Sequence, residues 1–260
     1  VRNNKTEGKI PLSKKGEEFL IFLFNYGRMR DGKISRYIYR YDSCENAKKS
    51  IEGKYIWMSS NSSFNDPFEG ILHADYENAQ DADIVEFYMA QKWTEAELIN
   101  LINDLKDNKK RKIIIEGMKN NHRNNVTAAG IFCCSEINDS ITMWSYYAQK
   151  HEGVCIEYDI LKDTAAFEFV IKMKYTKTFP PKVPLSQAKE GIDNEKSLLN
   201  VSLLTKSDCW ENEKEVRIIK TFKTGKIEIN PDCLKSVIFG LRCLKKDKEE
   251  MIKIMLEKGY

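Results

Sequence analysis

The sequence lacks any run of about eighteen consecutive apolar residues, the length that a helix needs to cross a bilayer. The mostly apolar stretch 19–26 covers about two helical turns, and it is not arranged in the basic, apolar and small-residue order of a signal peptide. We therefore expect a cytoplasmic protein with no membrane partner.

Metal-ligand spacing and an excess of charge are also missing. None of the seven cysteines stands in a C-x-x-C pair, so the usual spacing of a structural zinc site is absent and we expect no metal. Several cysteines lie in apolar runs such as 132–134 and 154–156, as is typical of reduced, buried thiols. The 42 basic and 39 acidic residues give a net charge of +3, so the sequence predicts no general nucleic-acid-binding surface.

No repeat, linker or low-complexity tract divides the 260 residues. A chain of this length can bury a sizeable core, and we expect a single domain over residues 1–260 in which the polar segment 1–12 is flexible. Residues 81–121 contain no strand pattern, and apolar residues recur there at helical spacing, as at Leu98, Leu101 and Leu105. We interpret this stretch as a helical insertion.

Apolar and aromatic patterns on both sides of the insertion predict strands and helices in an irregular order. Strands are predicted at 37–41, 55–59, 128–135, 153–158, 169–175, 215–221, 226–229 and 236–239, and helices at 13–26, 43–53, 140–149 and 244–258. Three prolines predict a loop at 178–184. Without a steady βαβ alternation, this order favours an α+β fold with a mixed, mainly antiparallel sheet.

Two segments in the first third of the chain could bind a ligand. Arg40 stands between Tyr39 and Tyr41 at a strand end, where a guanidinium could clamp a phosphate while rings pack a base or ribose. An arginine stacked on tyrosine at a sheet edge explains the same pattern. The serine-rich stretch 59–69, which includes Ser59 and Ser60, reads equally well as a binding loop and as a structural turn.

A third candidate segment combines aromatic residues with one of the three histidines. On the helix predicted at 140–149, Trp144 and Tyr147 share a face, and His151 follows just before Gly153. A histidine at such a junction could bind a phosphate or ribose or transfer a proton. A capping or packing role is the simpler interpretation.

Two more candidate segments lie near the end of the chain. If a strand begins at Glu213, then Glu213, Glu215 and Arg217 project from one face, and repulsion raises the pKa of one carboxyl unless a cation such as Arg217 compensates. A surface ladder of charges is an equal alternative. The turn 239–242 could present backbone N–H groups to an anion, but an ordinary strand exit explains it better.

Taken in order, these segments resemble a bacterial family known as domain of unknown function 2971. The resembling pieces are 39–41, 59–69, 132–135, 144–158, 206–217 and 239–241. The chain is also similar, more distantly, to the arginine-type ADP-ribosyltransferases, which carry an early-strand arginine, a serine-rich strand and a late Glu-x-Glu. Arg40, Ser59-Ser60 and Glu213-x-Glu215 follow that order, although the serine motif departs from the usual Ser-Thr-Ser.

The second resemblance implies a role for each matching residue. Arg40 would hold the pyrophosphate or ribose of NAD, and Ser59 or Ser60 would orient the glutamate. Glu215 would stabilise an oxocarbenium-like transition state, and Glu213 would activate the acceptor. We therefore expect a bacterial ADP-ribosyltransferase or NAD glycohydrolase of a toxin or phage-defence system, with NAD as substrate and an unidentified protein or nucleic-acid acceptor.

Two other classes of function compete with this prediction. A non-catalytic module could bind a nucleotide or another phosphorylated ligand through Arg40, His151 and Arg217, with Trp144 and Tyr147 as packing surfaces. A metal-dependent hydrolase or nuclease could use carboxylates such as Asp66 and Glu69, but no compact metal-ligand motif supports it. A protein-interaction role for the aromatic residues is a further alternative.

Overall fold

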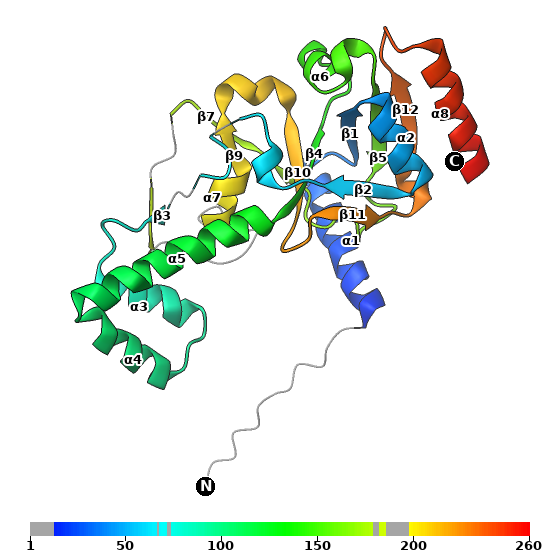
Figure 1. Cartoon of the computed structure of the whole chain (residues 1–260). Coiled ribbons are helices and arrows are strands. Elements are labelled where there is room, and N and C mark those ends of the chain that lie inside the picture. Colours follow the sequence, from blue (N-terminus) through cyan, green and yellow to red (C-terminus); the bar gives the residue numbers. More distant parts are fainter. Residues whose placement is uncertain (1–12, 67, 72–73, 179–181, 186–197) are drawn as a thin grey trace.

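A computed structural model describes residues 13–66, 68–71, 74–178, 182–185 and 198–260 (Figure 1). The segment predicted to be flexible, 1–12, and part of the predicted proline loop, 179–181, lie outside these residues. No helix within the described part of the chain is long and apolar enough to cross a membrane.

A six-stranded antiparallel sheet forms the centre of the molecule. Its spatial order is β12 (Leu234–Phe239), β5 (Val154–Asp159), β1 (Tyr37–Asp42), β4 (Gly130–Ser135), β10 (Glu215–Lys220) and β6 (Ile171–Lys172). The neighbouring strands pair antiparallel throughout, and β1 with β5 and β10 with β4 each form six residue pairs. The α+β class and the mainly antiparallel sheet that the sequence predicts are confirmed.

Helices α2 (Cys44–Glu52) and α8 (Lys245–Lys258) pack together beside β5 and β12 (Figure 1). Ser43 caps α2 by accepting a hydrogen bond from the backbone N–H of Asn46, and Gly53 ends this helix. Buried apolar side chains of α2, α8 and one face of the sheet form the largest core cluster, which helix α1 (Lys14–Arg30) joins through Met29. This packing leaves the opposite face of β1, β4 and β10 available for a site.

Short strand pairs flank the central sheet. Strands β2 (Tyr55–Met58) and β11 (Gly225–Glu228) pair antiparallel, whereas two further pairs are parallel. The parallel pairs are β3 (Ala74–Asp75) with β8 (Val183–Pro184) and β7 (Lys174–Thr176) with β9 (Thr205–Ser207). The predicted proline loop therefore contains a two-residue strand, and the predicted strand 169–175 is divided between β6 and β7.

The predicted helical insertion is confirmed by three helices that extend away from the sheet as a lobe (Figure 1). They are α3 (Asp81–Ala90), α4 (Glu95–Leu105) and α5 (Asn108–Ala128), of which α5 runs seven residues beyond the predicted end at 121. A separate core cluster that includes Ile84, Leu101 and Met118 holds the lobe together. Helix α5 then leads directly into β4 and so connects the lobe to the sheet.

Short helical elements complete the described chain. They are η1 (Asn61–Ser63), α6 (Ile141–Tyr146), η2 (Gln149–His151), α7 (Leu198–Leu204), η4 (Asp208–Glu213) and η5 (Pro231–Cys233). Helix α7 is absent from the sequence prediction. The proposed strand start at Glu213 is wrong, because Glu213 ends a 3₁₀ helix, Lys214 adopts a left-handed conformation with φ 44°, and β10 begins at Glu215.

Candidate functional site

A fork between strands creates the site. Strand β4 pairs with β1 only at Ser135, opposite Tyr39, and with the end of β2 only at Ile131, opposite Ser59. Between these two points β4 lacks a strand partner on this side. There the guanidinium of Arg40 donates a 2.9 Å hydrogen bond to the carbonyl oxygen of Cys133. An arginine side chain thus fills the place of a missing strand contact.

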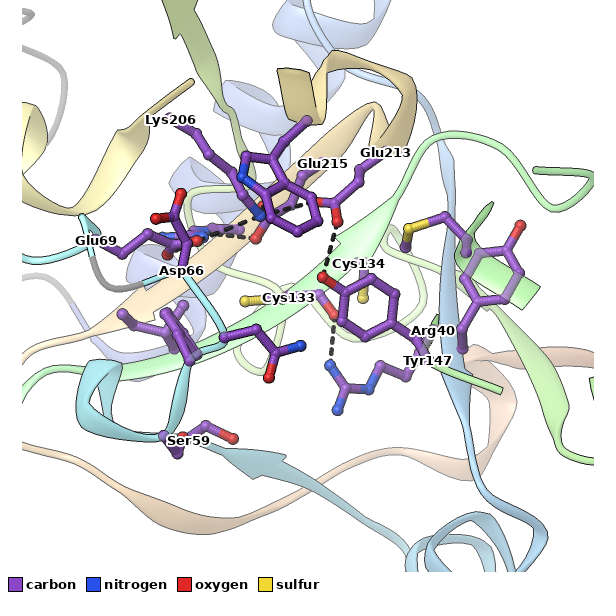
Figure 2. Close-up of a pocket in the computed structure, with 18 of the residues that line it drawn as sticks. Arg40, Ser59, Asp66, Glu69, Cys133, Cys134, Tyr147, Lys206, Glu213 and Glu215 are labelled. Carbon is purple, nitrogen blue, oxygen red and sulfur yellow. Dashed lines mark hydrogen bonds and ion pairs between the residues drawn. The ribbon is translucent and has the colours of Figure 1, made fainter. Parts of the chain in front are cut away.

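A hollow of about 230 Å³ opens at this fork (Figure 2). Its walls come from β1, β4 and β10, from the turn after β2, from α6 and from η4. The lining residues are Tyr39, Arg40, Tyr41, Ser59, Ser63, Phe64, Asn65, Asp66, Glu69, Ile131, Cys133, Cys134, Met143, Tyr147, Lys206, Trp210, Glu213, Glu215 and Arg217. Four acidic, three basic and several aromatic side chains therefore share one concave surface.

A buried lysine joins three of the carboxylates. The Nζ atom of Lys206 lies 2.7 Å from Oε2 of Glu213, 3.1 Å from Oε2 of Glu215 and 3.2 Å from Oε1 of Glu69. The lysine and all three glutamates have side chains no more than 5% exposed. The Nζ atom also lies 4.9 Å from the centre of the Trp210 ring. Burial strengthens the Coulomb attraction between these groups but also costs desolvation energy, so the loss of one partner would be strongly destabilising.

Arg217, two residues after Glu215 on β10, extends the cluster. Its Nε donates to Oε1 of Glu215 at 2.6 Å, and its other nitrogens donate to Glu69 at 2.5 Å and to the carbonyl of Leu203 at 2.7 Å. The Phe64 ring covers the guanidinium at 4.9 Å. Two cations thus face three glutamates, and the cluster keeps one formal negative charge when all five groups are ionised.

The two adjacent glutamates have pKa values that move in opposite directions. Burial alone raises the pKa of Glu215, but the charges of Arg217 and Lys206 outweigh burial and hold that pKa at about 2. Burial also raises the pKa of Glu213, and there Lys206 and the hydroxyl of Tyr147, which donates to Oε1 at 2.7 Å, offset it only in part. Glu213 is therefore the carboxyl suited to proton transfer, and Glu215 is a fixed anion.

Local backbone geometry brings the two glutamates onto the same lysine. Lys214 adopts a left-handed conformation between η4 and β10, and the carboxylates of Glu213 and Glu215 on either side of it both reach Nζ of Lys206. The hydroxyl of Ser135 fixes this turn by donating to the carbonyl of Glu213 at 2.6 Å. The backbone N–H of Glu215 donates to the hydroxyl of Tyr175 at 2.8 Å. The site thus rests on hydrogen bonds between three separate segments.

Six of the residues predicted from the sequence meet in the hollow. They are Arg40, Ser59, Tyr147, Glu213, Glu215 and Arg217. Ser60 does not line it; its hydroxyl donates to the carbonyl of Thr127 and accepts from the backbone N–H of Ser62. The structure therefore places one of the two candidate serines at the fork and the other in a capping role.

Trp144 and His151 also lie outside the lining. Their rings stack with centroids 6.1 Å apart, and the indole N–H of Trp144 donates to the carbonyl of Asn138 at 2.9 Å. Helix α6 ends at Tyr146, so Tyr147 is its C-cap, and Trp144 and Tyr147 both pack in the core cluster that contains Tyr41. Trp144 packs on Tyr41 in the core, while the hydroxyl of Tyr147 reaches Glu213.

The turn at 239–242 packs against the backbone at His151. The backbone N–H of Arg242 donates to the carbonyl of His151 at 2.9 Å, and that of Gly240 donates to the carbonyl of Gly153 at the same distance. A Cβ atom at residue 240 would lie 2.1 Å from the carbonyl oxygen of His151. The glycine thus permits a close backbone approach, in agreement with an ordinary strand exit.

Sequence reasoning assigned no role to Lys206, the residue around which the site is organised. It also cited Glu69 only as a metal ligand, although Glu69 contacts both cations. Within the described residues, no group of three or more histidine, cysteine, aspartate or glutamate side chains has the geometry of a metal site. The ammonium group of Lys206 lies where Glu69, Glu213 and Glu215 converge, so a divalent cation would have to displace it.

The comparisons with known proteins identify one part of the chain. A family described as "Protein of unknown function (DUF2971)" matches residues 143–218. This range includes Tyr147, Lys206, Glu213, Glu215 and Arg217, and it excludes Arg40 and Ser59. Neither the curated proteins nor the solved structures gave a match.

Proposed function

We propose that the protein cleaves the N-glycosidic bond of NAD and transfers ADP-ribose to an acceptor or to water. The observation that carries the proposal is the pair Glu213 and Glu215, whose pKa values diverge inside one hollow that Arg40 also lines. Adjacent carboxyl groups in different protonation environments suit glycosidic bond cleavage, in which one group moves a proton and the other stabilises positive charge.

Each group has a defined part in the proposed reaction. The bond between the ribose C1′ and the nicotinamide nitrogen breaks, and its electron pair leaves with neutral nicotinamide. Positive charge then develops on the ribose, where the carboxylate of Glu215, whose pKa is lowered by Arg217 and Lys206, stabilises it. Glu213 accepts the proton of the acceptor hydroxyl as its oxygen forms the new bond to C1′, and later releases that proton to solvent.

The hydrogen bonds of the two arginines support different roles for them. Arg217 is buried, and its guanidinium contacts two carboxylates and a carbonyl, so it serves to position Glu215 and Glu69. Arg40 makes a single hydrogen bond to the described part of the chain, to Cys133, and its Nε lies 3.5 Å from Asp42. Its remaining N–H groups suit a bidentate contact with a phosphate.

Nicotinamide release from NAD, followed by chromatography, tests the proposal. We expect the wild-type protein to release nicotinamide and Glu213→Gln to lose at least about a hundredfold in rate, since general acid–base catalysis contributes this much. Glu136→Gln is a matched control, because Glu136 is a partly buried glutamate that pairs with Lys172 outside the hollow. Absence of release by wild type with water and with varied acceptors, or full turnover by Glu213→Gln, would remove the proposal.

The same hollow also favours a second candidate, a nucleotide-binding module without turnover. The observation behind it is that Lys206 binds both glutamates at hydrogen-bond distance and so reduces the negative charge that each can offer. Calorimetry distinguishes the two functions. Affinity for NAD that depends on Arg40, together with no nicotinamide release, would establish the binding module.

A further inference from the structure

A second hollow of about 380 Å³ begins at the same fork. Arg40 and Ser59 line it together with residues of β1, α2, β2, β4 and β5. Its other lining residues are Asp42, Asn46, Lys49, Ser50, Tyr55, Ile56, Trp57, Phe132, Ile156 and Tyr158. The two hollows therefore meet at Arg40 and Ser59.

The strand register places Arg40 between the two hollows. Arg40 pairs with Ile156 across β1 and β5, so its side chain leaves the sheet on the side of the large core. Glu215 and Arg217 lie on the other side, because Val216 between them packs into that core. The guanidinium of Arg40 reaches back through the fork to the carbonyl of Cys133, and its carbon lies 5.5 Å from the centre of the Phe132 ring.

The second hollow has the chemistry of a nucleoside site. The buried side chains of Phe132, Ile156 and Tyr158 make its inner wall apolar. Trp57 is 54% exposed and can stack on a base, while Asn46 and Ser50 supply polar groups. Among the described residues that line it, Asp42 is the one acidic residue, whereas four carboxylates line the first hollow.

We propose that the ligand passes through the fork, with a nucleoside in the second hollow and its phosphates at Arg40. A ribosyl group then lies in the first hollow, which we call the acidic hollow because four carboxylates line it. A ligand of this shape has two wide ends and a narrow anionic middle, as a dinucleotide does. The carboxylates of the acidic hollow repel phosphate. The phosphates are therefore placed at those N–H groups of Arg40 that do not bind Cys133. This inference rests on the proposed function, because it assigns the two halves of NAD to two hollows.

Calorimetry with two partial ligands tests the inference. ADP-ribose carries the adenosine half, and nicotinamide mononucleotide carries the other half. We expect Trp57→Ala to weaken ADP-ribose binding about tenfold, because the variant loses the stacking of the base on an aromatic side chain. Trp57→Phe keeps a ring and should retain most of the affinity. Binding of nicotinamide mononucleotide should remain unchanged in both variants.

Trp93→Ala is a matched control, because Trp93 is a partly exposed tryptophan that lines neither hollow. Unchanged ADP-ribose affinity in a folded Trp57→Ala protein, equal weakening of both ligands, or no binding of ADP-ribose to wild type would each overturn the inference. Nicotinamide release reports separately on the proposed function. Loss of ADP-ribose affinity in Trp57→Ala without release by wild type would leave the nucleoside site standing and remove the reaction.

Discussion

The Nζ atom of Lys206 lies 2.7 Å from Oε2 of Glu213, and the same ammonium group contacts Glu215 and Glu69. One side chain from β9 therefore connects the turn after β2 with the two glutamates near the start of β10. Because the contact is buried, water cannot solvate the carboxylates if the ammonium group is removed, and the folded state is then strongly destabilised. Folding and the arrangement of the carboxylates thus depend on the same residue.

Replacing Lys206 with methionine should lower the free energy of unfolding by about 3–5 kcal/mol, the usual cost of removing one partner from a buried ion pair. Arg217 would then be the one cation left in the cluster, where it pairs with Glu69 and Glu215, and Glu213 would lose the ion pair that it forms with Lys206. Urea unfolding at pH 7 measures the change. Lys49→Met is the control, because Lys49 forms an exposed pair with Glu45 and its loss should change stability by less than about 1 kcal/mol.

The difference in free energy of unfolding between wild type and Lys206→Met should also become smaller as the pH falls. In wild type the pKa of Glu215 is about 2, below its ordinary value, so its ionised form stabilises the fold. That stabilisation is complete above about pH 4.5 and is lost as the pH falls toward 2. In the variant the pKa of Glu215 is less strongly lowered, so the ionised form contributes less stability at pH 7 and there is less to lose on acidification. An equal difference in free energy of unfolding between wild type and variant at pH 7 and at pH 3 would contradict the electrostatic explanation.

Replacing Tyr147 with phenylalanine should move the pH dependence of nicotinamide release. The hydroxyl of Tyr147 donates to Glu213 and stabilises its ionised form, so its removal raises the pKa of Glu213 further. Because the proposed general base must be ionised, activity rises with pH, and the acid limb of kcat/KM should shift upward by about one pH unit. The neighbouring Tyr146 is 68% exposed and lies outside the hollow, so Tyr146→Phe should leave the profile unchanged.

Much of the fold could be predicted from the sequence because its signals are local. Apolar and aromatic residues predicted the strands β1, β5 and β10, and the Asp42-Ser43 cap predicted the start of α2. The Glu213-x-Glu215-x-Arg217 pattern correctly indicated paired carboxylates with a compensating cation. Local periodicity, however, could not show that a left-handed turn at Lys214 separates Glu213 from the strand.

The centre of the site could not be predicted because its contacts are distant in sequence. Arg217 meets Glu69 across 148 positions, and no local pattern encodes that distance. Lys206 is the middle residue of β9, a three-residue strand that is too short for a periodic signal. For His151 the sequence allowed a ligand-binding role but favoured a capping or packing role, and its ring stacks on Trp144.

Alanine substitutions at two glycines should change stability in opposite directions. Gly240→Ala places a Cβ atom 2.1 Å from the backbone carbonyl oxygen of His151, so the strand exit must shift and the melting temperature should fall. Gly117→Ala lies inside α5, where a Cβ atom meets nothing within 4 Å, and should stabilise the helix by up to about 1 kcal/mol. Thermal unfolding compares the two, and a stabilised Gly240→Ala would contradict the close approach.

The thiols of Cys44 and Cys243 lie 3.5 Å apart in the core, so oxidation should join them into a disulfide between the start of α2 and the segment before α8. Diamide supplies the oxidant: it takes up two electrons and two protons, and the protein loses two hydrogen atoms. Burial raises the pKa of Cys44 to about 12, so the reaction should be slow compared with alkylation of the exposed Cys209.

Mass spectrometry of peptides under non-reducing conditions identifies the bond. The Cys44→Ser and Cys243→Ser variants should each lack it, whereas Cys209→Ser should form it at the wild-type rate. The cross-link joins residues 199 positions apart, so it restricts the unfolded chain and should raise the urea midpoint of the oxidised protein. A midpoint that falls on oxidation would show that the two segments cannot approach to bonding distance without straining α2 and α8.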